Sequence, residues 1–167
     1  LYELSLDFSD YSFINDEIVK IMMEKISGGR SNLGKLRMRF DQRPVSNQDR
    51  HVSEKQVGSM IRSIFKMQLL EELDLQLPPK GLDLAENDEE ESLGEDIEGL
   101  PRLVKVRLAL WGDCDSIQTT ILGVMDLLGR CRRLREIELG MDESRIDWEG
   151  MTKILRGYVR KLKGLQI

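Results

Sequence analysis

The chain has 167 residues, of which 40% are hydrophobic and 33% charged. This length and balance predict one folded domain with a sizeable core, and they exclude both a disordered chain and a pair of ordinary-sized domains. The net charge of −5 is local, because nine of the 30 acidic residues lie in residues 81–98, leaving 21 acidic residues against 25 basic ones elsewhere.

The first predicted element is a strand at residues 1–6, LYELSL, whose pattern L-x-x-L-x-L recurs along the chain. It returns at residues 33–38 (LGKLRM), 70–75 (LEELDL), 103–108 (LVKVRL), 134–139 (LREIEL) and 162–167 (LKGLQI). Successive starts are 32, 37, 33, 31 and 28 residues apart. Leucine at alternate positions predicts half-buried strands, and self-similarity at this period indicates a solenoid of about six strand units.

Between the strands, the apolar residues adopt helical spacing. The predicted stripes are Ile18, Met22 and Ile26; Val57, Ile61, Ile64 and Met67; Ile117, Ile121, Val124 and Leu128; and Trp148, Met151, Leu155 and Tyr158. The sequence Ser53-Glu-Lys-Gln56 has the form of a capping box and predicts a helix start. Each unit is therefore expected to be a strand, a turn and a helix, which gives parallel strands joined by right-handed crossovers and apolar stripes facing the core.

The third unit departs from this plan. Pro78 and Pro79 cannot donate backbone hydrogen bonds, and the acidic run after them has no helical stripe. We expect an acidic loop at about 79–98. It is either a solvated loop or a docking strip for a basic partner, with Glu89, Glu90 and Glu91 as candidate contacts.

On these motifs the chain resembles the ribonuclease-inhibitor-like leucine-rich repeat family over essentially all its residues. The resemblance implies an α/β solenoid, a horseshoe with parallel strands on the concave face and helices on the convex face. Three residues after the strand motif, where the family usually has asparagine or cysteine, the chain has Ser9, Asp41, Pro78, Trp111 and Asp142. We therefore expect irregular units in a single domain at 1–167 that, starting at Leu1 within a strand, is part of a longer protein.

In this register, positions three, five and seven of each strand unit point to the concave face. They hold Glu3, Lys35, Glu72, Lys105 and Glu136; then Ser5, Arg37, Asp74, Arg107 and Glu138; then Asp7, Arg39, Gln76, Ala109 and Gly140. Acidic and basic strands thus alternate, which predicts either ion-pair ladders that fix strand order or a charged surface for a partner protein. A uniform basic strip for nucleic acid is not expected. The register requires Leu73 and Leu75 to be buried and Glu72 to lie beside Lys35 or Lys105.

Two segments invite a catalytic interpretation that their context opposes. Residues 29–35 satisfy G-x-x-x-x-G-K, but Leu36 follows where a phosphate loop needs serine or threonine, and the segment leads from a helix into a strand. His51, the one histidine, lies in a polar loop and is expected to be solvated.

The two cysteines, Cys114 and Cys131, form no disulfide framework, which is typical of an intracellular, cytoplasmic protein. Cys114 lies between two aspartates but has no further metal ligands nearby, and a helix is expected from Ser116. Cys131 has three arginines around it that could lower its pKa, although a packing role at a helix end is the better interpretation. We expect no enzyme activity, cofactor or metal. No run of apolar residues approaches the ~18 residues that a membrane-spanning helix needs, so no membrane insertion is expected.

The resemblance implies protein binding by a non-catalytic interaction module, a scaffold or accessory subunit of a larger assembly. Alternatives are the substrate-recognition part of a ubiquitin-ligase adaptor, or a Ran-type GTPase activator, whose family also carries acidic segments. Protein partners are expected, with no nucleic acid and no small-molecule substrate. The candidate partner-binding residues are Arg37, Arg39, Asp74, Arg107, Trp111, Glu89, Glu90 and Glu91.

Overall fold

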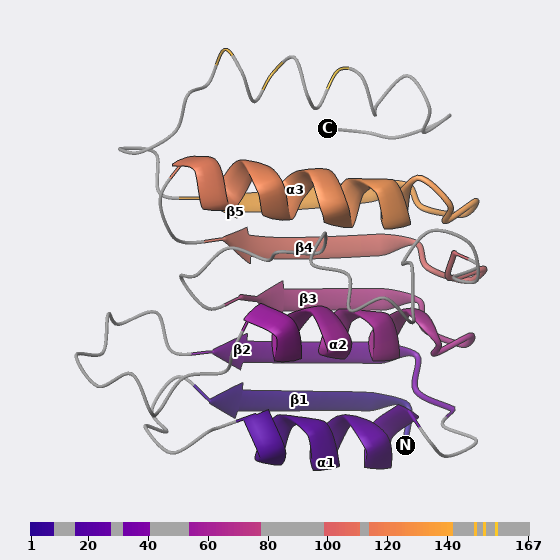
Figure 1. The fold of residues 1–167 in the computed structure, drawn as a ribbon. Coiled ribbons are helices and arrows are strands. Elements are labelled where there is room, and N and C mark those ends of the chain that lie inside the picture. Colours follow the sequence, from indigo (N-terminus) through magenta and orange to yellow (C-terminus); the bar gives the residue numbers. More distant parts are fainter. Residues whose placement is uncertain are drawn as a thin grey trace, which may run out of the picture.

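The structure, a computed structural model, describes residues 1–8, 16–27, 32–40, 54–77, 99–110 and 114–141, with Glu149, Thr152 and Arg156. The elements in these ranges are, in order, β1 (Glu3–Phe8), α1 (Asp16–Ser27), β2 (Lys35–Phe40), α2 (Glu54–Phe65), β3 (Glu72–Gln76), β4 (Lys105–Leu110), α3 (Cys114–Leu128) and β5 (Glu136–Met141) (Figure 1). The predicted acidic loop, His51, Trp111 and the sixth strand lie outside the described residues.

The described strands form one parallel sheet in chain order, β1-β2-β3-β4-β5 (Figure 1). Glu72 of β3 lies in register with Lys35 of β2 and with Lys105 of β4. Leu73 and Leu75 are each only 2% exposed. The predicted register is therefore confirmed across these strands, and the fold is α/β with an all-parallel sheet.

The three helices of the described part lie on one face of this sheet, in front of the strands in Figure 1. Because strand side chains alternate between faces, every second strand residue points toward the helices. The buried strand residues are Leu36, Met38 and Phe40 of β2; Leu73 and Leu75 of β3; and Val106, Leu108 and Leu110 of β4. Together with apolar side chains of the helices they form one core, while the opposite face of the sheet carries the polar residues.

The strands begin with a recurring hydrogen-bond arrangement. The N–H groups of Gly34 and Lys35 both donate to the carbonyl of Tyr2, at 2.8 and 2.9 Å. The same arrangement joins Glu71 and Glu72 to Gly34, Val104 and Lys105 to Glu71, and Arg135 and Glu136 to Val104. In each case the accepting carbonyl belongs to the second residue of the leucine motif in the preceding unit. The start of each following strand is thus hydrogen-bonded to the start of the strand before it.

The turns that precede β3, β4 and β5 also have the same hydrogen bond. Leu70, Leu103 and Leu134 donate their N–H groups to the carbonyls three residues earlier, those of Met67, Leu100 and Cys131. These three earlier residues are all buried, at 6%, 0% and 2% exposure. Cys131 therefore occupies the position that an apolar side chain fills in the other two turns.

The helix predictions are right in the middle of the sheet and partly wrong at its first edge. Val57, Ile61, Ile64 and Met67 are buried as predicted, and so are Ile121, Val124 and Leu128. In α1, however, the fully buried residues are Val19 and Met23, whereas the predicted core residue Ile18 is 45% exposed. The other two residues of the predicted stripe, Met22 and Ile26, are partly buried against the core, so only its first residue is turned outward. Helix α3 begins at Cys114, two residues before the predicted start.

Candidate functional site

The candidate site is the face of the sheet opposite the helices, which we call the charged face. It comprises the residues at positions three, five and seven of β1 to β5, namely Glu3, Ser5, Asp7, Lys35, Arg37, Arg39, Glu72, Asp74, Gln76, Lys105, Arg107, Ala109, Glu136, Glu138 and Gly140. Their sequence pattern predicted these neighbours, and the register confirms them. Parallel sheets are usually covered on both faces. In the described part of the chain, helices cover only the other one.

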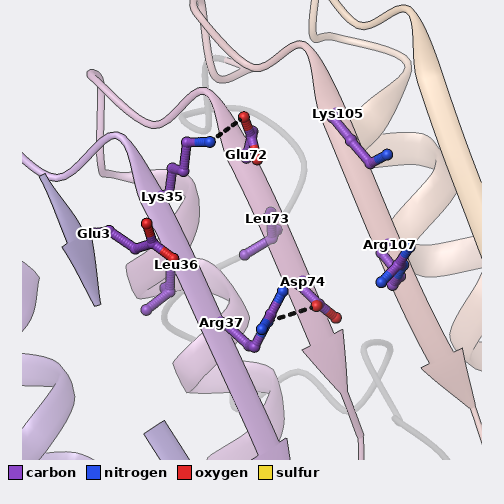
Figure 2. A pocket seen from close by; sticks show the side chains of 9 residues that line it. All are labelled: Glu3, Lys35, Leu36, Arg37, Glu72, Leu73, Asp74, Lys105 and Arg107. Carbon is purple, nitrogen blue, oxygen red and sulfur yellow. Dashed lines mark hydrogen bonds and ion pairs between the residues drawn. The ribbon is translucent and has the colours of Figure 1, made fainter. Parts of the chain in front are cut away.

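Strands β2 and β3 are joined on this face by two ion pairs. The Nζ atom of Lys35 lies 2.6 Å from Oε1 of Glu72, and Nε of Arg37 lies 2.8 Å from Oδ2 of Asp74 (Figure 2). The hydrogen bond to Glu72 raises the pKa of Lys35 above its ordinary value. The side chains of Lys35 and Arg37 are thus oriented toward β3.

Strands β4 and β5 form a second set. Lys105 Nζ lies 2.5 Å from Oε1 of Glu136 and 2.7 Å from Oε1 of Glu138, and Arg107 also pairs with Glu138. Hydrogen bonds from Arg107 and then Lys105 lower the pKa of Glu138 from 4.5 to about 2. In the same way, the hydrogen bond to Glu136 raises the pKa of Lys105.

Lys105 and Arg107 of β4 therefore form their ion pairs with β5, although the acidic residues of β3 lie in register on the other side of β4. Figure 2 shows the amine of Lys105 turned away from Glu72. As a result, the charged face consists of a β2–β3 set and a β4–β5 set of ion pairs.

The charged face is hollowed between these strands. A hollow of about 380 Å³ is lined by Glu3, Lys35, Leu36, Arg37, Glu72, Leu73, Asp74, Lys105 and Arg107 (Figure 2). The side chains of Arg37 and Arg107 are 46% and 48% exposed despite their ion pairs. The hollow thus presents fixed charges of both signs, four of them basic and three acidic.

The structure brings together three of the predicted site residues, Arg37, Asp74 and Arg107, in this hollow. Arg39 lies further along β2, beside Asp7 and Gln76 and outside the hollow. Trp111, Glu89, Glu90 and Glu91 lie outside the described residues, so their role remains a prediction.

Sequence reasoning did not select Lys35, Glu72 and Lys105 as site residues, although they line the hollow. The sequence could have identified them, because they occupy the third position of successive strand units, where acidic and basic residues alternate. That row of alternating charge was interpreted either as an ion-pair ladder or as a surface for a partner protein, but none of its residues was named as a candidate contact.

An aromatic residue missed by the sequence analysis lies at the rim of this face. The hydroxyl of Tyr2 donates to Oε2 of Glu71 at 2.6 Å, a contact that raises the pKa of Tyr2. The ring passes over Gly34, where an added Cβ would lie 2.2 Å from Cε2 of Tyr2. Glycine at 34 thus lets the ring span from β1 to the start of β3, with Tyr2 remaining 53% exposed. A side chain with an apolar body and a polar tip is suited to an interface.

Cys131 is a packing residue, as the better of the two interpretations held. Its thiol is buried, and burial raises its pKa to about 11, opposite to the lowering that nearby arginines could cause. In the described ranges, no three His, Cys, Asp or Glu residues are grouped so that they could hold a metal ion. The described helices include none whose length and hydropathy would suit a membrane crossing.

Comparisons of the chain with protein-family models, with curated proteins and with solved structures found no significant match. The chemistry of the charged face is therefore argued from its own residues.

Proposed function

We propose that this chain is a non-catalytic protein–protein interaction module, a scaffold or accessory subunit of a larger assembly, and that the charged face binds its partner. We further propose that the sheet is part of a leucine-rich repeat solenoid. The recurring strand-start hydrogen bonds and the three equivalent turns support that architecture, because each unit contacts its neighbours in the same way.

The observation that carries the proposal is the hollow between β1 and β4, with its exposed but ordered charges. Ion pairs hold Lys35 and Arg37 against β3, so a partner would lose little side-chain entropy by binding them. Fixed charges of alternating sign favour a polypeptide surface with a complementary pattern. A phosphate backbone, by contrast, is bound by clustered basic residues.

A purely structural role for these ion pairs is the competing interpretation. Exposed pairs of this kind contribute little to the free energy of unfolding, because solvent screens the charges. A role in fixing strand order is compatible with binding, since the same contacts that order the strands also orient the charges.

The proposal is tested by capturing the full-length protein from its own cells under mild conditions, cross-linking amines and identifying the linked peptides by mass spectrometry. We expect stoichiometric partners linked through Lys35 and Lys105, which line the hollow. Lys20 and Lys66, both exposed and outside that hollow, serve as matched controls. Recovery of the protein alone, or of partners linked only through Lys20 or Lys66, would contradict the proposed surface.

A further inference from the structure

We propose that the element of the partner bound by the charged face is an α-helix that lies across the strands, with acidic and basic residues alternating once per turn on the side facing the sheet. This inference rests on the proposed function and adds the shape, direction and charge pattern of the bound element. The acidic residues of the helix lie over β2 and β4, and its basic residues lie over β3 and β5.

The sign of the charge is constant along each of the strands β2 to β5 and changes from one strand to the next. Positions three and five are basic in β2 and β4 and acidic in β3 and β5. These residues are Lys35, Arg37, Lys105 and Arg107, and Glu72, Asp74, Glu136 and Glu138. The charge pattern therefore alternates across the strands and not along them, so a complementary partner element has to cross the strands.

The hollow of the charged face has the same direction as this pattern. Its lining comes from four neighbouring strands, β1 to β4, but only from positions three to five of each strand (Figure 2). With strands about 4.8 Å apart, three strand spacings are about 14 Å, whereas two residues along a strand span about 6.6 Å. The hollow is thus about twice as long across the strands as along them, and an elongated element fits it crosswise.

The spacing of the charges favours a helix over an extended chain. Residues three or four apart lie on one side of an α-helix, and its pitch of about 5.4 Å exceeds the strand spacing by about 0.6 Å. In an extended segment, residues on one side are about 6.6 Å apart, an excess of about 1.8 Å per strand. Over the three steps from β2 to β5, an extended segment would drift by about 5.4 Å, more than one strand, and meet the wrong sign. A helix would drift by about 1.8 Å, which long charged side chains can absorb.

The charges of the sheet remain accessible to such a helix although they pair with one another. The ion pairs of Arg37 and Arg107 use Nε, so the terminal nitrogens of each guanidinium lie outside those pairs. The side chains of both arginines, and of Glu72 and Glu136, are nearly half exposed. Since the ion pairs already orient these groups, they can form charge-assisted hydrogen bonds to a helix with little further ordering.

Small residues border the charges where the body of a crossing helix would lie. At position seven, Ala109 of β4 and Gly140 of β5 are in register. A Cβ added to Gly140 would lie 3.7 Å from the Cβ of Ala109, an ordinary contact, so local packing does not require glycine there. Glycine inside a strand weakens the strand and often marks the close approach of a ligand or of another backbone. The two small residues thus leave room for the helix beside the charges.

The test compares two fluorescent peptides of identical composition, each held helical by a hydrocarbon staple on the side away from the charges. The alternating peptide is Ala-Glu-Ala-Ala-Ala-Lys-Ala-Ala-Glu-Ala-Ala-Ala-Lys-Ala. The blocked peptide is Ala-Glu-Ala-Ala-Ala-Glu-Ala-Ala-Lys-Ala-Ala-Ala-Lys-Ala. Laid across four strands of alternating sign, the blocked peptide places two of its four charges over like charges in every alignment. Circular dichroism checks that the two peptides are equally helical.

Binding to the full chain is measured by fluorescence anisotropy up to millimolar concentrations. We expect the alternating peptide to bind at least about tenfold more tightly than the blocked peptide. An unstapled alternating peptide with proline in place of a central alanine cannot form the helix and should not bind.

Three variants of the protein locate the contact, and circular dichroism confirms that each of them folds. Gly140→Leu places a bulky side chain where the helix lies and should weaken binding of the alternating peptide at least about tenfold, whereas Gly140→Ala should weaken it less. Lys20→Ala removes an exposed charge of α1, far from the charged face, and should leave binding unchanged.

Equal affinity for the alternating and blocked peptides, or no binding of either, would overturn the proposal. Binding of the proline peptide as tight as that of the stapled one, or unchanged affinity in Gly140→Leu, would overturn it as well. Failure of the proposed function is distinguishable from these outcomes, because partners cross-linked through Lys35 and Lys105 would support the charged face as a binding surface whatever the shape of the bound element.

Discussion

Replacing one leucine in the middle of the sheet, and its counterpart at the edge, should destabilise the protein to different extents. Leu6 of β1 and Leu75 of β3 belong to the same register row, linked through Met38 of β2. Leu75 is 2% exposed, so Leu75→Ala leaves a cavity in a closed core and should cost about 2–5 kcal/mol of unfolding free energy. Leu6 is only partly buried, so Leu6→Ala should cost about 1–2 kcal/mol.

Urea unfolding followed by circular dichroism measures both changes, with Leu75→Met as a control that keeps side-chain volume and should cost less than about 1.5 kcal/mol. Since small domains have only about 5–15 kcal/mol of stability, the loss at Leu75 should be evident as a clear shift of the midpoint. Equal losses for Leu6→Ala and Leu75→Ala would refute the reasoning, because they would mean that the core is as well covered at β1 as at β3.

Three further predictions concern the contacts of Gly99, Glu138 and Cys131. Gly99→Ala should destabilise the fold by about 1–3 kcal/mol or more in thermal unfolding, because the new Cβ would lie 2.3 Å from the backbone carbonyl of Arg130; an unchanged melting temperature would contradict this contact. Glu138 has a pKa lowered from 4.5 to about 2 in the folded state, chiefly by Arg107, so its stabilising contribution is present above pH 4.5 and is lost as the pH falls toward 2. Wild-type stability should therefore fall more steeply over that range than stability of E138Q, and parallel profiles would argue against the contact. Cys131, whose pKa is raised to about 11 by burial, should react with a thiol reagent at pH 8 only on unfolding. Rapid reaction of Cys131 in the native protein, located by peptide mapping, would contradict its burial.

The sequence predicted the strand register because leucine at alternate positions leaves little freedom. A slip of one residue would turn Leu73 and Leu75 to solvent, so the leucines alone place Glu72 beside Lys35 and Lys105. The recurrence of the motif predicted the order of the strands for the same reason, since each unit returns the chain to the next position in the sheet.

The partners of individual charges could not be predicted in the same way. Lys105 lies in register with an acid on each side, Glu72 and Glu136, and the choice depends on rotamers and on a second acid, Glu138, within reach. The spacing of residues in the sequence does not show which of these acidic residues Lys105 will pair with. The two exposed arginines of the hollow, Arg37 and Arg107, were predicted because they need only the register to be placed.

The side of α1 that is buried could not be predicted from the hydrophobic pattern either. Ile18, Met22 and Ile26 form one apolar stripe, and Val19 and Met23 form another beside it, so hydrophobic periodicity alone allows either to face the core. In the structure both stripes contact the core, since Val19 and Met23 are fully buried and Met22 and Ile26 are partly buried against it. Of these residues only Ile18 is turned outward, which depends on how α1 lies over β1.

The most direct test of the charged face as a binding surface is a charge exchange, Arg37→Asp together with Asp74→Arg, assayed against the partner identified by cross-linking. The exchanged pair still attracts across β2 and β3, although an arginine at position 74 would lie in register with Arg107. Both side chains at that contact are on the exposed face, so the unfolding free energy should stay within about 2 kcal/mol of wild type. The charges offered to a partner are reversed, and we predict at least about tenfold weaker binding by titration calorimetry. Unchanged affinity in a folded exchange variant would mean that these charges serve only the sheet, and it would contradict the proposed binding surface.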